Sequence, residues 1–278
     1  MSRVLCLLLL LYAAARVLQA HPDKVPMLAI VALHVLTPLF FALLHGALRY
    51  GVRGILVFTG LCLGVGNASE NLGVLTGFPF GHYHFTDVMG PKLVQVPILL
   101  GLAYIGMGYL SWTLGLLIVA DTSKPLAGSR VLTVPLAAAF VMVAWDLSMD
   151  PTWSLLVHGW VWHGGGAYFG VPVSNFLGWY GTVFLIYLGF ALYLRSHPAA
   201  AFPLPFRCWQ LAVIFYAASA AGNLFVLAPP GLPAVTDASG ATWKVGDILG
   251  ASALVSIFVM GAFALLAWVR LMDGRGTR

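Results

Sequence analysis

The sequence predicts an all-α membrane protein, a polytopic bundle of about eight transmembrane helices in one integral membrane domain, residues 1–278. Two features of the composition support this fold class: 60% of the residues are hydrophobic and only 8% are charged. Soluble domains carry about 25% charged residues. Nine acidic residues cannot solvate the surface of a globular chain of 278 residues, so lipid must be the main solvent.

The third observation is a series of apolar runs, each long enough to cross a bilayer, which takes about 20 mostly apolar residues. Proline cannot donate a backbone hydrogen bond, so Pro26, Pro97 and Pro203 are expected at helix ends. The eight predicted spans are roughly 4–20, 26–48, 54–75, 94–120, 131–149, 174–194, 208–228 and 247–269.

The first run has a second interpretation. Arg3, a leucine run and Ala20 are also typical of a secretory signal peptide. If that peptide is cleaved, seven spans remain and nothing downstream changes. We favour a true span because the apolar run is continuous and eight spans fit the charge pattern more simply.

The basic residues predict the orientation. With the N-terminus in the cytoplasm, the opposite side holds only Lys24, Lys92 and Lys244, with Arg16 near it. This asymmetry follows the positive-inside rule, so we expect a multi-pass protein of the cell membrane with both termini cytoplasmic. The cytoplasmic segments hold Arg3, Arg49, Arg53, Lys124, Arg130, Arg195, Arg207, Arg270, Arg275 and Arg278.

Several functional classes are excluded by the same reading. The net charge of +5 does not indicate nucleic-acid binding, because the positive charges lie between apolar runs, where they orient a membrane protein. The three cysteines lie far apart in apolar segments and predict neither a metal site nor a disulfide framework. The run 164–166 lacks the rest of a phosphate-binding loop, and no GxSxG motif occurs.

One group of polar residues lies in the third predicted span and just after it. Asn67, Glu70 and Asn71 are spaced three and four apart, so they share one helical face. The span runs outward, which puts this face in its outer third. The following loop, FPFGHYHFTDVMGPK, brings further polar side chains to the same side: His82, His84 and Asp87.

A second group ends the fifth predicted span, in the sequence AWDLSMDP. Asp146 and Asp150 are four residues apart and share a face beside Trp145, and Pro151 is expected to close the helix. The segment 151–173 is too apolar for a free loop, so we expect a re-entrant or interfacial segment over the outer mouth of the bundle. It contains His158 and His163, and Asn175 follows it; five of the nine tryptophans, between Trp145 and Trp179, provide an aromatic wall.

Charge within a membrane is costly, so Glu70 and Asp146 are functional candidates, although a buried structural hydrogen bond is the alternative role. For Asp87 and Asp150, a helix cap or a solvated loop position is an equal alternative. Half of the tryptophans fit an interfacial aromatic belt. No bound metal is expected, because only one HxH pair occurs where membrane oxygenases carry many histidine boxes.

Four stretches in collinear order give the chain a family resemblance. It resembles the carotenoid biosynthesis family of membrane proteins that includes CruF-type carotenoid 1′,2′-hydratases. The resemblance covers roughly residues 55–195, and its most specific parts are WDLSMDP and GVPVSNFLGW. The stretches are GNASENLGVLTGFPFGHYHFTD, VPILLGLAYIGMGYL, WDLSMDP and YFGVPVSNFLGWY.

The resemblance implies addition of water to the terminal 1′,2′ double bond of an acyclic carotenoid end, as in γ-carotene, lycopene or a C50 precursor, without a cofactor. A carboxylic acid kept protonated by apolar surroundings can protonate C2′, and aromatic faces stabilise the tertiary cation at C1′. We expect Asp146 as the acid and Asp150 or Glu70 as the group that positions water. His82 and His84 are candidates for tuning or relaying protons.

The other candidate residues for binding substrate or water are Asn67, Asn71, Asp87, Trp145, His158, His163 and Asn175. The expected partners are the carotenoid and membrane lipid, with other enzymes of the pathway as candidates. A rival function is carotenoid binding or transport without catalysis. A prenyltransferase is disfavoured because no Asp-rich magnesium motif occurs.

Overall fold

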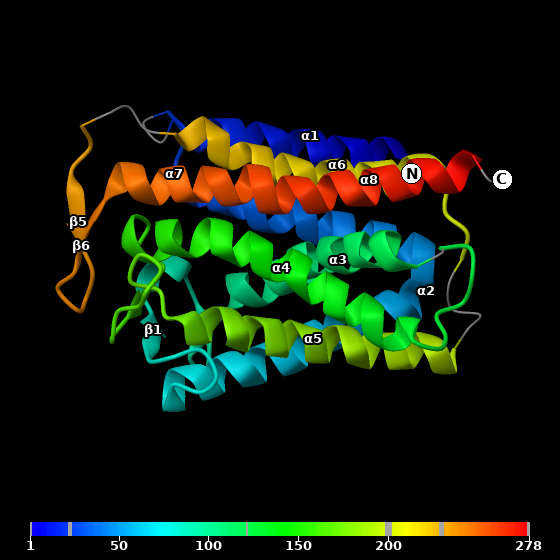
Figure 1. The fold of residues 1–278 in the computed structure, drawn as a ribbon, viewed down its shortest axis with the longest axis horizontal. Coiled ribbons are helices and arrows are strands. Elements are labelled where there is room, and N and C mark those ends of the chain that lie inside the picture. Colours follow the sequence, from blue (N-terminus) through cyan, green and yellow to red (C-terminus); the bar gives the residue numbers. More distant parts are fainter. Residues whose placement is uncertain (1, 22–23, 121, 198–201, 228–230, 277–278) are drawn as a thin grey trace.

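A computed structural model describes residues 2–21, 24–120, 122–197, 202–227 and 231–276. The last residue of the predicted span 208–228 and the basic Arg278 lie outside these ranges. The described chain forms an elongated bundle whose helices run along the long axis (Figure 1). The helices are α1 (Ser2–Leu18), α2 (Met27–Thr76), α3 (Ile98–Val119), α4 (Arg130–Leu155), α5 (Val173–Ser196), α6 (Phe206–Gly222), α7 (Val245–Val255) and α8 (Gly261–Gly276).

Six of the described helices are long and apolar enough to cross a membrane, which confirms the all-α membrane bundle. One of them joins α7 to α8 through a π-helical turn, η4 (Ser256–Met260). The α1 helix, with 17 residues, falls just short of that length. The α2 helix counts once in this set although it covers two predicted spans.

A glycine divides α2 into these two spans. Gly51 has φ 68° and ψ 170°, a backbone conformation open almost only to glycine. The two halves of the helix run in opposite directions on either side of this break (Figure 1). The eight predicted spans therefore correspond to α1, the halves of α2, α3, α4, α5, α6 and the joined α7–α8 helix.

The α3 helix lies at the centre, since every residue from Tyr104 to Leu117 is buried. It packs against α2 and α4, and α5 packs against both of these helices. Both chain termini lie at one end of the bundle (Figure 1). The strands β1, β5 and β6 lie at the opposite end, which we call the cap end.

Short strands connect the helices at the cap end. Tyr83–Phe85 (β1) pairs in antiparallel fashion with Trp160–Trp162 (β4), with Tyr83 opposite Trp162. We call this pair the cap sheet. The segment predicted to be re-entrant or interfacial thus contributes a strand to an ordered cap. The other elements are η1 (Asp87–Met89), β2 (Lys92–Leu93), β3 (Val96–Pro97), η3 (Asn223–Val226), β5 (Ala234–Thr236) and β6 (Thr242–Lys244).

The expected end of α4 at Pro151 was wrong, because the helix continues to Leu155. A proline inside a helix leaves the carbonyl four residues earlier without its usual donor. Here that carbonyl belongs to Leu147, and it accepts a hydrogen bond of 3.1 Å from the Tyr168 hydroxyl. The replacement donor explains why the helix tolerates the proline.

Candidate functional site

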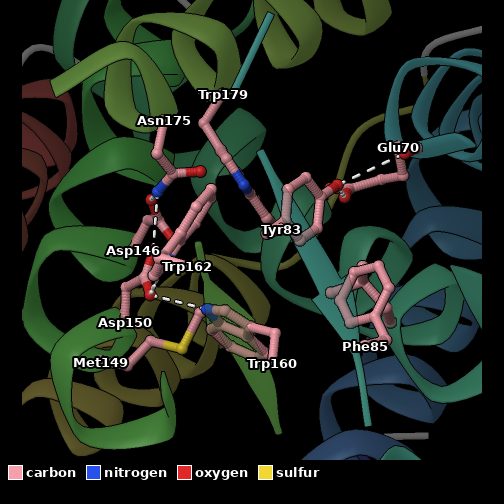
Figure 2. Close-up of a pocket in the computed structure, with 11 residues that line it drawn as sticks. Glu70, Tyr83, Phe85, Asp146, Met149, Asp150, Trp160, Trp162, Asn175 and Trp179 are labelled. Carbon is pink, nitrogen blue, oxygen red and sulfur yellow. Dashed lines mark hydrogen bonds between the residues drawn. The ribbon is translucent and has the colours of Figure 1, made fainter. Parts of the chain in front are cut away.

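The three acids of the predicted clusters meet in one pocket at the cap end (Figure 2). Glu70 is 2% exposed, and Asp146 and Asp150 are each 1% exposed. The cap sheet and four helices provide the walls. We call this space the acid pocket, and it is lined by Glu70, Tyr83, Phe85, Leu100, Asp146, Met149, Asp150, Trp160, Trp162, Asn175 and Trp179.

One amide connects the two aspartates. Asp146 and Asp150 share the buried face of α4, as their spacing predicted, and Asn175 approaches them from the first turn of α5. Its Nδ2 donates to Oδ2 of Asp146 at 3.1 Å and to Oδ2 of Asp150 at 2.6 Å. Both amide hydrogens are used in this way, so the amide oxygen of Asn175 faces away from the aspartates.

Asp150 also holds the cap sheet. Its Oδ1 accepts hydrogen bonds from the indole nitrogens of Trp160 at 2.8 Å and Trp162 at 3.3 Å. In the described residues Asp150 therefore accepts three side-chain hydrogen bonds and Asp146 accepts one, from Asn175. Because β4 alternates buried and partly buried residues, both tryptophans point inward from the same face of the strand.

Glu70 is held separately by two tyrosines. Tyr83 donates to its Oε2 at 2.5 Å, and Tyr104 of α3 donates to its Oε1 at 2.6 Å. Burial and the neighbouring Glu70 carboxyl raise the pKa of Tyr83 well above its ordinary value, so this hydroxyl remains a donor at physiological pH. Glu70 consequently accepts well-formed hydrogen bonds while lying opposite the aspartate pair (Figure 2).

Aromatic rings separate the two groups of acids. The Tyr83 and Trp162 rings lie 4.8 Å apart between centroids, and Tyr104 stacks on Trp179 at 4.6 Å with an interplanar angle of 10°. The faces of such rings attract a cation electrostatically. The acid pocket thus combines proton donors and acceptors with surfaces that can stabilise a positive charge.

The pocket acids accept their hydrogen bonds from neutral groups. An ion pair joins Lys92 to Asp87 at 3.6 Å, outside the pocket. The acid pocket has a cavity volume of about 20 Å³, enough for one water molecule. Carboxyl groups, aromatic faces and room for water are the components that acid-catalysed addition of water requires.

Several predicted residues lie outside the acid pocket. Asn71 bonds to Asn67 at 2.7 Å and accepts from the backbone N–H of Gln95, so this pair positions the turn between β2 and β3. Trp145 is partly buried and contacts Trp179, with 6.4 Å between ring centroids. Their predicted role in binding substrate or water stays a prediction.

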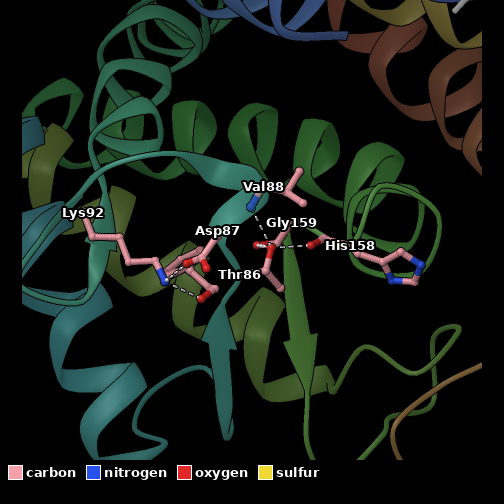
Figure 3. Close-up of polar contacts among 7 residues, drawn as sticks. Thr86, Asp87, Val88, Lys92, His158 and Gly159 are labelled. Carbon is pink, nitrogen blue, oxygen red and sulfur yellow. Dashed lines mark hydrogen bonds and ion pairs between the residues drawn. The ribbon is translucent and has the colours of Figure 1, made fainter.

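Asp87 and His158 belong to the polar contacts beside the cap sheet (Figure 3). The Thr86 hydroxyl donates to the carbonyl of His158 at 2.6 Å, while the His158 ring is directed away (Figure 3). Lys92 donates to the Phe85 carbonyl at 2.7 Å and pairs with Asp87. The Thr86 contact connects the end of β1 to the segment before β4, and both predicted residues lie outside the pocket.

The other three histidines predicted as site residues lie on the outer face of the cap sheet. His84 Nδ1 lies 2.7 Å from His163 Nε2, and both residues are exposed, as is His82. Burial, His163 and Lys92 lower the pKa of His84. Because neighbouring strand residues point to opposite faces, Tyr83 and Phe85 enter the pocket while His82 and His84 do not.

The sequence did not single out Tyr83, Phe85 or Tyr104 as site residues. The alternation in HYHF indicates a strand, and it could have predicted that Tyr83 and Phe85 share a face opposite the histidines. Tyr104 lies in a uniformly apolar span and gave no comparable signal. Its contact with Glu70 depends on the packing of α3 against α2.

Of the comparisons with known proteins, the one with protein-family models gives a match. No curated protein and no solved structure matches the chain significantly. A protein-family model described as carotenoid biosynthesis protein matches residues 26–233, about three quarters of the chain. The matched region includes the whole acid pocket and the cap sheet. The chain therefore belongs to the carotenoid biosynthesis protein family.

Proposed function

We propose that the protein is a hydratase that adds water to the terminal 1′,2′ double bond of an acyclic carotenoid end. The observation that carries this proposal is the acid pocket itself: three buried carboxyl groups, aromatic faces between them, and room for one water molecule. γ-Carotene, lycopene and C50 carotenoids offer such an end. Membership in the family supports carotenoid chemistry, and the pocket supports addition of water.

In the proposed reaction, Asp146 protonates C2′ of the alkene, which breaks the π bond and leaves a tertiary cation at C1′. The rings of Trp162, Trp179 and Tyr83 stabilise this cation. Water then forms a bond to C1′ and loses a proton to a carboxylate. The product is a tertiary alcohol. The proton released by water restores the protonated form of Asp146.

The hydrogen bonds favour Glu70 over Asp150 as the group that positions water. A carboxylate has about four acceptor sites. Asp150 uses three of them for Asn175, Trp160 and Trp162. Glu70 uses two for its tyrosines, which leaves sites for water. Asp146, with one side-chain donor, is the group least stabilised as an anion and therefore the one we assign as the acid.

We also propose that the protein lies in the cell membrane with the cap end outside and both termini in the cytoplasm. The termini lie at one end of the bundle (Figure 1). Arg3 lies in the first turn of α1, Arg53 follows the break at Gly51 in α2, and Arg270 lies in α8, the last helix. The basic-residue rule places such an end in the cytoplasm. The acid pocket would then lie near the outer surface, within reach of a lipid-dissolved substrate.

The test is expression in a bacterium that produces lycopene or γ-carotene, followed by mass analysis of the pigments. The proposal predicts products heavier than the substrate by one water. Unchanged pigments, with the protein present in the membrane, would contradict it. The parallel expression of Asp87→Asn, an exposed acid outside the pocket, serves as the matched control and should give the same products as the wild type.

The rival function, carotenoid binding or transport, uses the same pocket without chemistry. Acid-to-amide substitutions separate the two functions. A binding protein should keep its pigment when Asp146 becomes asparagine, since the side chain retains its size. A hydratase should lose product formation.

A further inference from the structure

We propose that His84 and His163 form a binding site for a divalent transition-metal ion, such as Zn²⁺, on the outer face of the cap sheet. This site is separate from the acid pocket and does not depend on the proposed hydratase activity. It would connect β1 to β4 through a metal ion.

The register of the cap sheet brings the two imidazoles together. His84 lies opposite Val161, and His163 follows β4 directly, where its backbone N–H donates to the carbonyl of His82 at 2.9 Å. The side chains of His84 and His163 therefore emerge on one face as diagonal neighbours, a separation that long side chains can bridge. Their ring nitrogens approach to 2.7 Å.

The protonation state and the spacing of the two rings suit metal binding. Two imidazoles at hydrogen-bond distance require one ring to accept, so at least one of them is neutral, the form that binds metals. Two Zn–N bonds of about 2.0–2.1 Å in tetrahedral geometry place the nitrogens about 3.3 Å apart. The pair needs to widen by only about 0.6 Å, which small side-chain rotations provide.

The surroundings permit access and leave open coordination positions. Both histidines are exposed, so a metal ion can reach them. Among the described residues no third His, Cys, Asp or Glu completes a set of metal ligands, so water would fill the remaining coordination positions. Lys92 is the nearby positive charge that acts on His84. Its ammonium group is engaged by Asp87 and the Phe85 carbonyl, which limits its repulsion of a cation.

Metal binding on the outer face would also affect the inner face of the same sheet. Residues adjacent to the two histidines, Tyr83 and Trp162, line the acid pocket. A metal ion that joins β1 to β4 would hold these strands together more firmly. Bound Zn²⁺ should therefore raise the thermal stability of the purified protein, because a ligand that binds only the folded state stabilises that state.

The experiment is a Zn²⁺ titration of the full-length protein in detergent, by competition with a chromophoric chelator, combined with thermal unfolding. We expect one Zn²⁺ per chain and a higher unfolding temperature in its presence. His84→Ala and His163→Ala should each weaken binding by at least about tenfold, since loss of even an indirect support of a metal ligand costs that much. Both variants should also lose the thermal shift.

His158→Ala is the matched control, because His158 is an exposed histidine on the same cap whose ring takes no part in the pair. This variant should bind Zn²⁺ like the wild type. Absence of stoichiometric binding by the wild type would overturn the proposal. Unchanged binding in both His84→Ala and His163→Ala would overturn it as well. Neither result bears on the hydratase, whose assay needs no added metal.

Discussion

The Asn175 amide nitrogen lies between Asp146 and Asp150, 3.1 Å from one carboxyl and 2.6 Å from the other. It therefore fixes the relative position of two buried acids that differ in their other contacts. Asp150 accepts two further hydrogen bonds from indole groups of the cap sheet. The difference suggests a division of roles, in which Asp150 supports the structure and Asp146 performs chemistry.

Asp150→Asn should destabilise the protein. The new amide group would present a donor where Asn175 or an indole already donates, and an unsatisfied buried donor costs about 1–3 kcal/mol. We expect a lower unfolding temperature in detergent than for the wild type. Asp87→Asn, at a fully exposed surface ion pair, should leave the unfolding temperature close to that of the wild type. Equal stability of the two variants would refute the supporting role.

The fold was largely predictable because its signals are local. Length and hydropathy identified the long helices of the bundle, and the pattern of basic residues predicted an even number of crossings. The fate of Pro151 was not predictable, since the hydroxyl that replaces its missing donor comes from Tyr168 in a later loop. The backbone conformation of the turn at Gly51 could not be predicted either, although the sequence correctly separated the spans on either side.

Gly51→Ala should disturb the turn between the two halves of α2. The backbone conformation at this position, φ 68° and ψ 170°, costs a residue with a side chain about 1–3 kcal/mol. A reduced unfolding temperature is the expected result. Gly60→Ala is the control, because a Cβ at this helical position would meet no atom within 4 Å. That substitution should be neutral or stabilising by up to about 1 kcal/mol.

The acid pocket was predictable only in part. Helical spacing placed Asp146 and Asp150 on one face, and the predicted directions of the spans placed Glu70 at the same end. The tyrosine partners of Glu70 could not be predicted, since Tyr104 reaches it from another helix and Tyr83 from a short strand. Strand pairing also decides which residues of the cap point inward, and this turned His82 and His84 away from the pocket.

The orientation can be tested with reporters of opposite location. A fusion at the C-terminus should be active only for a reporter that works in the cytoplasm. An insertion at Gly240, the exposed tip between β5 and β6, should be active only for a reporter that works outside. The reverse pattern would place the acid pocket near the cytoplasmic surface and contradict the proposed orientation.

Glu70→Gln should impair capture of water more than protonation of the alkene. If Glu70 accepts the proton of the attacking water, the cation in this variant will lose a proton and return to alkene. In deuterated buffer, membranes with Glu70→Gln should therefore yield little alcohol, while the recovered carotenoid gains deuterium. Tyr104→Phe, which removes one donor to Glu70, should show a weaker form of this effect. Recovered carotenoid without deuterium would exclude this role for Glu70.

The most direct test of the acid's assignment compares wild type and Asp146→Asn in the same deuterated assay, at matched protein levels in the membrane. An asparagine keeps the size of the side chain but cannot supply the proton. We predict that formation of alcohol carrying deuterium at C2′ falls by about 10²–10⁴-fold, the usual contribution of a general acid, and that the recovered carotenoid contains no deuterium. Hydration at a near-normal rate by Asp146→Asn would contradict the assignment and transfer the acid's role to Glu70 or Asp150.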